Sequence, residues 1–85
     1  GSAQLLNTRG VVKQLSGDAA GARKDYEAAV KADPANFSAM MNLGAALAAA
    51  GEREKAAELY GRAARTAAPG EQKINAERAA AASLE

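Results

Sequence analysis

The sequence predicts an all-α fold, a right-handed α-solenoid of antiparallel helical hairpins with five helices. The main observation is that residues 3–36 and 37–70 are two copies of one 34-residue unit. The matching positions include Gly10 with Gly44, Gly17 with Gly51, and Tyr26 with Tyr60. A fixed period of this length is typical of stacked helical repeats. Alanine, which has the strongest intrinsic helix propensity, accounts for 25 of the 85 residues.

The first unit contains two predicted helices. One runs from about Ala3 to Ser16 and is followed by Gly17, since glycine readily takes the left-handed conformation found after many helices. The side chains expected on its inner side are Leu5, Leu6, Val12 and Leu15. Asp18 is a good N-cap for the next helix, which extends to about Ala32. The residues expected to pack inward from it are Ala22, Tyr26, Ala29 and Val30.

The second unit repeats this arrangement. Pro34 cannot continue the preceding helix, and its fixed φ suits the start of a new one at about Ala35. This third helix runs to about Ala50, and Gly51 ends it. Its apolar stripe consists of Met40, Leu43 and Leu47. A fourth helix is predicted over residues 52–66, with Ala56, Leu59, Tyr60 and Ala63 facing inward.

A fifth helix is predicted over residues 71–83, after the turn signal Pro69-Gly70. Ile74 is its only large apolar residue. Connections of two to four residues require neighbouring helices to be antiparallel. We therefore expect one domain over residues 3–83, and we interpret residues 1–2 and 84–85 as cloning remnants.

The recurring residues resemble the tetratricopeptide repeat. In the second unit the resemblance rests on Asn42-Leu43-Gly44, Ala56, Tyr60, Ala63 and Pro69, and in the first on Gly10, Gly17, Ala22, Tyr26, Ala29 and Pro34. It implies that Gly44 and Ala56 are contact points within a hairpin, and that Tyr60 packs toward the next repeat. It also implies that residues 71–83 form a capping helix, and that the first helices of the hairpins line a groove that binds a protein or peptide.

Two residues depart from this family pattern. Arg9 lies where the family usually has leucine, and Lys13 lies where a large side chain such as tyrosine is usual. We expect their aliphatic stems to cover the packing surface while the charged groups reach water.

The residue inventory argues against an enzyme. The chain has no histidine and no cysteine, and no serine has a base that the repeat would hold beside it. Carboxylates such as Asp25 and Glu52 are assigned to solvated faces and helix starts. No cofactor or metal is expected, because no cluster has ligand spacing. A net charge of +1 without a basic cluster disfavours nucleic acid, and no apolar run of ~18 residues predicts membrane insertion.

The candidate protein-binding residues are those that the resemblance places along the groove: Asn7, Val11, Gln14, Met41, Asn42, Ala45 and Lys73. Asn42 matches the asparagine of the carboxylate clamp by which some family members hold the acidic C-termini of heat-shock chaperones. Lys73 matches a clamp lysine only if the extra residue before Pro69 is allowed, and Asn7 and Val11 depart from the clamp pattern. A mixed groove of small side chains suits an apolar or helical segment.

Two function classes remain open. One is a scaffold or assembly factor that binds a protein or peptide in its groove. The alternative is a self-associating structural element that forms a homo-oligomer, because two repeats fall short of the three or so usually needed for stability. The alanine- and arginine-rich repeats also resemble those of bacterial proteins that assist the assembly of secreted fibres or envelope complexes. The mass in solution distinguishes the two classes.

Overall fold

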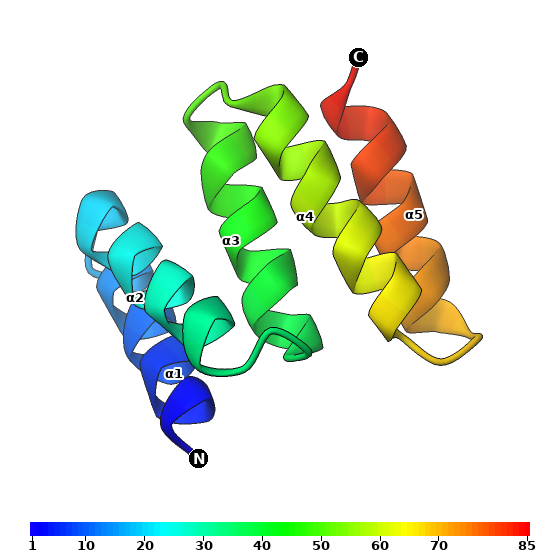
Figure 1. The fold of residues 1–85 in the computed structure, drawn as a ribbon. Helices are drawn as coiled ribbons and strands as arrows, with labels where there is room; N and C mark the ends of the chain where they lie inside the picture. Colours follow the sequence, from blue (N-terminus) through cyan, green and yellow to red (C-terminus); the bar gives the residue numbers. More distant parts are fainter.

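The computed structural model describes residues 1–85 and consists of five helices without strands. The helices are α1 (Ser2–Leu15), α2 (Ala19–Ala32), α3 (Phe37–Ala49), α4 (Arg53–Thr66) and α5 (Glu71–Ser83). α1 and α2 form one antiparallel hairpin, α3 and α4 form a second, and α5 packs on α4 (Figure 1). The predicted all-α architecture of hairpins with a trailing helix is confirmed.

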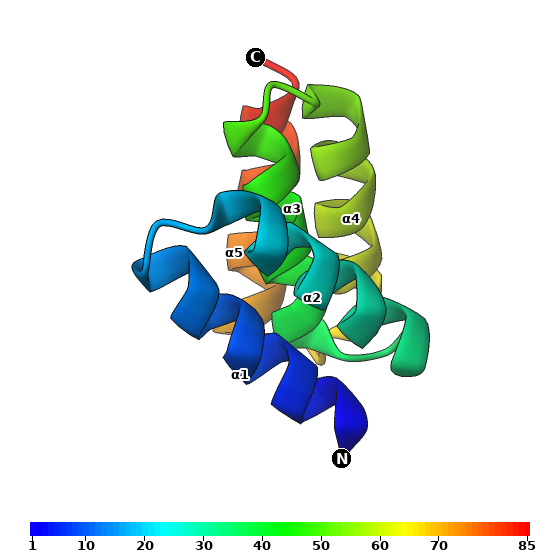
Figure 2. The same cartoon turned by 90° about the vertical axis from the view of Figure 1, so that its left-hand side faces the viewer.

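The two hairpins stack so that α2 lies against α3. Seen from the α1–α2 end, α1, α3 and α5 lie on one side of the molecule and α2 and α4 on the other (Figure 2). α1 also touches α3, so the first helices of the hairpins share a continuous surface. No helix combines the length and the apolar character that crossing a membrane requires.

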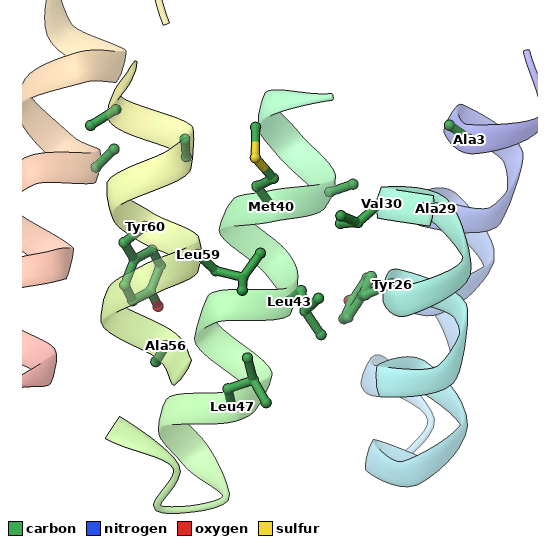
Figure 3. Close-up of a cluster of buried hydrophobic side chains, with 14 of the residues drawn as sticks. Ala3, Tyr26, Ala29, Val30, Met40, Leu43, Leu47, Ala56, Leu59 and Tyr60 are labelled. Atoms are coloured by element: carbon green, nitrogen blue, oxygen red, sulfur yellow. The ribbon is translucent and has the colours of Figure 1, made fainter. Parts of the chain in front are cut away.

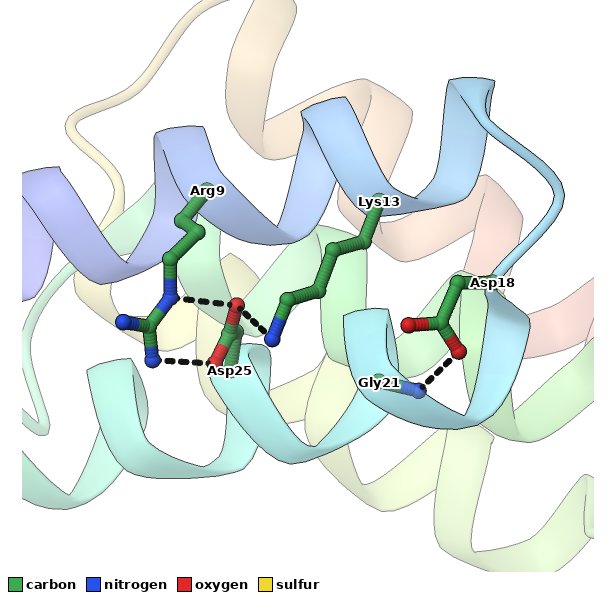
Figure 4. A network of polar contacts seen from close by, with 5 residues as sticks. All are labelled: Arg9, Lys13, Asp18, Gly21 and Asp25. Atoms are coloured by element: carbon green, nitrogen blue, oxygen red, sulfur yellow. Dashed lines mark hydrogen bonds and ion pairs between the residues drawn. The ribbon is translucent and has the colours of Figure 1, made fainter.

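Local side chains explain where the helices begin and end. The Asp18 carboxylate accepts a hydrogen bond from the Gly21 N–H at 2.9 Å, as an N-cap does (Figure 4). Gly17 and Gly51 have φ angles of 90° and 83°, the left-handed conformation predicted after α1 and α3. These three assignments are confirmed.

The start of α3 differs from the prediction by two residues. Asn36, rather than Pro34, precedes the helix, and its side-chain oxygen accepts a hydrogen bond from the Ala39 N–H at 3.0 Å. The Asp33 carboxylate accepts another from the Ala35 N–H at 3.1 Å. Because these two side chains satisfy the backbone donors, residues 33–36 form a turn and the helix begins at Phe37.

The core lies between the helices of each hairpin and between the hairpins (Figure 3). Its larger members are Tyr26, Val30, Met40, Leu43, Leu47, Leu59 and Tyr60, and alanines supply the rest. The inward faces predicted for α2, α3 and α4 are therefore confirmed.

Two glycines make room for the two buried tyrosine rings. A Cβ at Gly10 would lie 2.6 Å from a ring carbon of Tyr26, and one at Gly44 would lie 2.7 Å from a ring carbon of Tyr60. Gly44 is thus a contact point within its hairpin, as expected. The Tyr60 ring, expected to pack toward the next repeat, lies against Gly44 on α3 of its own hairpin.

The inner side predicted for α1 is also wrong. Leu5, Val12 and Leu15 are exposed by 73%, 57% and 83%, and only Leu6 of the predicted set packs against the core. The face that meets α2 contains Ala3 and Gly10 instead. Since the ring of Tyr26 occupies the space over Gly10, the helix turns its small residues inward and its larger apolar residues outward.

Candidate functional site

Two asparagines of the predicted groove join the two hairpins. Asn7 lies on α1 and Asn42 on α3, and both are half-buried. The Asn42 Nδ2 donates a hydrogen bond to the Asn7 Oδ1 at 2.9 Å. One polar atom of each side-chain amide therefore joins α1 to α3, while the Asn7 Nδ2 and the Asn42 Oδ1 form no hydrogen bond within the chain.

Gln14 on α1 is exposed, but its side chain is hydrogen-bonded to a core residue. Its Oε1 accepts a hydrogen bond at 2.7 Å from the Tyr26 hydroxyl, whose pKa is raised by burial. Gln14 also borders a hollow of about 330 Å³ between α2 and α3. The other lining residues, mostly alanines, are Ala19, Ala20, Ala22, Arg23, Ala46, Ala49 and Ala50.

The remaining candidates differ in their surroundings. Val11 on α1 and Ala45 on α3 are exposed, whereas Met41 is half-buried and packs partly against the core. Lys73, on α5, is half-buried and forms no hydrogen bond or ion pair with Asn7 or Asn42. The structure thus ties Asn7 to Asn42, and it does not assemble these residues with Lys73 into a clamp.

A charged cluster beneath α1 was not predicted. The Arg9 guanidinium donates two hydrogen bonds to the Asp25 carboxylate, at 2.9 and 2.8 Å, and the Lys13 Nζ lies 3.1 Å from the same carboxylate (Figure 4). The side chains of Arg9 and Lys13 do reach water, being 60% and 35% exposed, but the prediction missed that both are paired with Asp25. Asp25, expected on a solvated face, is instead buried where α1 meets α2.

Comparison with families of known proteins matches residues 12–71 to the family described as Tetratricopeptide repeat. That range contains more than half of the 85 residues. The chain belongs to the tetratricopeptide repeat family. Repeats of this family generally mediate protein–protein interactions. No curated protein matches the chain at a significant level.

Within this tetratricopeptide repeat domain, the charged cluster replaces apolar packing of the first hairpin. The bidentate contact of Arg9, with help from Lys13, lowers the pKa of Asp25 to about 2, although burial of the carboxyl group opposes the shift. A carboxyl group with a depressed pKa stabilises the folded state while it is ionised. Asp25 therefore links the charge state of the domain to the packing of α1 on α2.

We expect this carboxylate to make stability depend on pH. Its contribution is complete above its ordinary pKa of 3.8 and is lost as the pH falls through about 2. Asp25→Asn should therefore lower the thermal midpoint at neutral pH and flatten its decline between pH 4 and pH 2, as followed by circular dichroism.

Glu54→Gln, on the exposed start of α4, is the matched control and should keep the wild-type pH profile. Glu52 contributes a residual slope in every variant, since contacts with Arg23 and Lys55 lower its pKa as well. Parallel profiles for wild type and Asp25→Asn would contradict the role assigned to Asp25.

A second ion pair links the two repeats. The Arg23 guanidinium on α2 bonds to the Glu52 carboxylate, and Lys55 approaches the same residue at 3.1 Å. Arg23 and Glu52 are 29 residues apart. Helical spacing alone gives no signal for such a pair, because spacing relates only residues of one helix.

The candidate face is built from groups that form hydrogen bonds and apolar contacts. It presents amide groups beside small and apolar side chains, and no candidate residue is a nucleophile next to a base. No group of three or more acidic, histidine or cysteine side chains is placed to hold a metal ion.

Proposed function

We propose that this tetratricopeptide repeat domain binds an extended or helical segment of another protein, without catalysis and without a cofactor. The surface proposed for binding, called here the α1/α3 face, runs over the first helices of the two hairpins toward α5. It consists of Asn7, Val11, Gln14, Met41, Asn42, Ala45 and Lys73. The proposal makes the domain a scaffold or assembly module, and it does not involve nucleic acid or membrane insertion.

The observation that carries this proposal is the unpaired half of the Asn7–Asn42 contact. The bond between them uses the Asn42 Nδ2 and the Asn7 Oδ1. The amide nitrogen of Asn7 and the side-chain oxygen of Asn42 are left free, so the pair offers one donor and one acceptor side by side. An extended peptide presents the complementary carbonyl and N–H groups along its backbone.

Apolar contacts next to this pair support the same occupant. Val11 and Ala45 are exposed and the side chain of Met41 is half-buried, so each offers apolar surface to a partner. Methionine is a common component of adaptable binding surfaces. A C-terminal carboxylate is less favoured, because the Asn42 Nδ2 already has an acceptor and Lys73 is not joined to the pair.

The test uses peptides selected from a displayed random library on the wild-type domain. Ala45→Glu should weaken the selected peptides about tenfold or more, since it places a charge within an apolar contact. Ala45 is exposed, so this variant should fold normally. Calorimetric titration measures the affinities, which we expect near the micromolar range because the face is smaller than a standard interface of ~800 Å² per partner.

Glu58→Lys is the control. Glu58 is exposed on α4, away from the proposed face, and this variant should bind like wild type. Met41→Glu extends the series, with circular dichroism to verify folding because Met41 touches the core. Binding that survives Ala45→Glu and is abolished by Glu58→Lys would place the peptide site elsewhere.

A further inference from the structure

The exposed apolar side chains are concentrated on α1. Of the six large apolar residues that are exposed, four lie on this helix. Leu5, Val12 and Leu15 share one face with Thr8, because residues 5, 8, 12 and 15 follow the three- and four-residue spacing of a helix face. These four residues are called here the α1 stripe. Figure 2 shows α1 on the outside of the array, with no helix in front of it.

The 34-residue period shows what this face does in the other hairpin. The α3 residues equivalent to the α1 stripe are Ala39, Asn42, Ala46 and Ala49. Ala39 is completely buried, and Ala46 and Ala49 line one hollow together with residues of α2. In α3 this face is therefore the one that receives the preceding helix.

The same face is covered a second time in α5. The equivalent residues there are Lys73, Ala76, Ala80 and Ser83. Ala76 is completely buried and Ala80 packs against the core, and Lys73 and Ser83 are half-buried. α5 packs on α4. The domain thus uses this face twice as a helix-binding surface. In α1 no helix covers the equivalent face. This face of α1 also carries two leucines and a valine at the positions where α3 has alanines.

We propose that the α1 stripe binds the α1 stripe of a second copy of this chain, with the two helices antiparallel. The spacing of three, four and three residues reads the same in both directions. A two-fold axis on the outer side of α1, at the level of residue 10 along the helix, therefore places Leu5 opposite Leu15 of the second copy, and Thr8 opposite Val12. Each copy contributes the same self-complementary surface, as a two-fold interface requires.

The two edges of the α1 stripe are compatible with this arrangement. On one edge Val11 meets its own counterpart across the axis and adds apolar contact. On the other edge Arg9 approaches the second Arg9, but each guanidinium is already paired with Asp25. In each copy Arg9 and Lys13 share the single carboxylate of Asp25, so these three residues together carry one net positive charge. Added salt screens the remaining repulsion, so it should strengthen the association.

The expected dimer is weak and reversible. α1 has 14 residues, and a helix of that length spans about 21 Å. A single pair of such helices buries less than the ~800 Å² per partner of a standard interface. We therefore expect a dissociation constant in roughly the high-micromolar range.

Sedimentation equilibrium of the whole 85-residue chain tests the proposal. The average mass should rise with concentration from the 8.6 kDa of one chain toward twice that value. Leu15→Glu should weaken association about tenfold or more, because it brings a charge to the apolar contact. Ile74→Glu is the matched control, since Ile74 is an exposed apolar residue on α5, and it should associate like wild type.

Disulfide trapping tests the orientation, because the chain has no cysteine of its own. When Leu5→Cys and Leu15→Cys chains are mixed and oxidised, the disulfide between unlike chains should dominate over those between like chains. Dominant like-chain disulfides would overturn the antiparallel arrangement. A wild-type chain that stays monomeric at every concentration, or association lost in Ile74→Glu and kept in Leu15→Glu, would overturn the interface itself.

Discussion

Tyr26→Ala should destabilise the domain by about 3–5 kcal/mol, the cost typical of removing a buried aromatic side chain. Tyr26 is 1% exposed, and its ring fills the space over Gly10 where α1 crosses α2. The total stability expected for 85 residues is about 4–13 kcal/mol on the per-residue average. The loss is therefore a large share of the total, and it should be visible as a collapse of the helical circular-dichroism melt.

Tyr26→Phe separates the ring from its hydroxyl group. This variant keeps the packing over Gly10 and loses only the hydrogen bond to Gln14, so it should cost about 0.5–1.5 kcal/mol. Chemical denaturation measures both variants on one scale. If Tyr26→Ala melted within a few degrees of wild type, the ring could not be the support of the first hairpin.

The architecture was predictable because its signals are local and occur twice. Asp18 caps α2 through the Gly21 N–H only three residues away, and Gly17 and Gly51 end their helices through their own conformation. Each of these effects acts within a few residues, where sequence spacing and structure coincide. The start of α3 differs from the prediction because Pro34 is suited to an earlier helix start, whereas the side chain of Asn36 provides the actual N-cap.

The packing of α1 was mispredicted because its partner lies on another helix. Periodicity identifies an apolar stripe, but it cannot say whether that stripe faces the hairpin or the outside. Here the inward face carries Lys13, which the buried Asp25 of α2 makes tolerable. Asp25 lies 16 residues beyond Arg9, so no helical spacing relates the two. A basic residue at an apolar family position, with an acidic residue on the facing helix, is the signal that could have revealed the pair.

The candidate face was predictable as a location but not as a set of contacts. The resemblance indicated which helices contribute residues, and Asn7 and Asn42 do lie close together. That they bond to each other, and that Gln14 is bonded to Tyr26, depends on how one hairpin stacks on the next and how α1 crosses α2. Those angles follow from the packing of many side chains, which no single motif specifies.

Gly44→Leu should destabilise the domain by about 1–3 kcal/mol through overpacking. Even a single added carbon at Gly44 would lie 2.7 Å from the ring of Tyr60, so the larger leucine side chain has to push α3 and α4 apart. Gly61 provides the opposite case on the same hairpin. A Cβ there would meet only the Arg65 guanidinium, at 3.5 Å, which is an ordinary contact.

Gly61→Ala should therefore stabilise the domain by up to about 1 kcal/mol, since alanine is the better helix former and nothing has to move. Urea denaturation of Gly44→Leu, Gly61→Ala and wild type gives the three free energies of unfolding on one scale. The contrast isolates close packing from helix propensity, because both changes replace a glycine within a helix of the same hairpin. A stable Gly44→Leu together with a destabilised Gly61→Ala would show that the close contact between α3 and α4 lies at another turn of the helices.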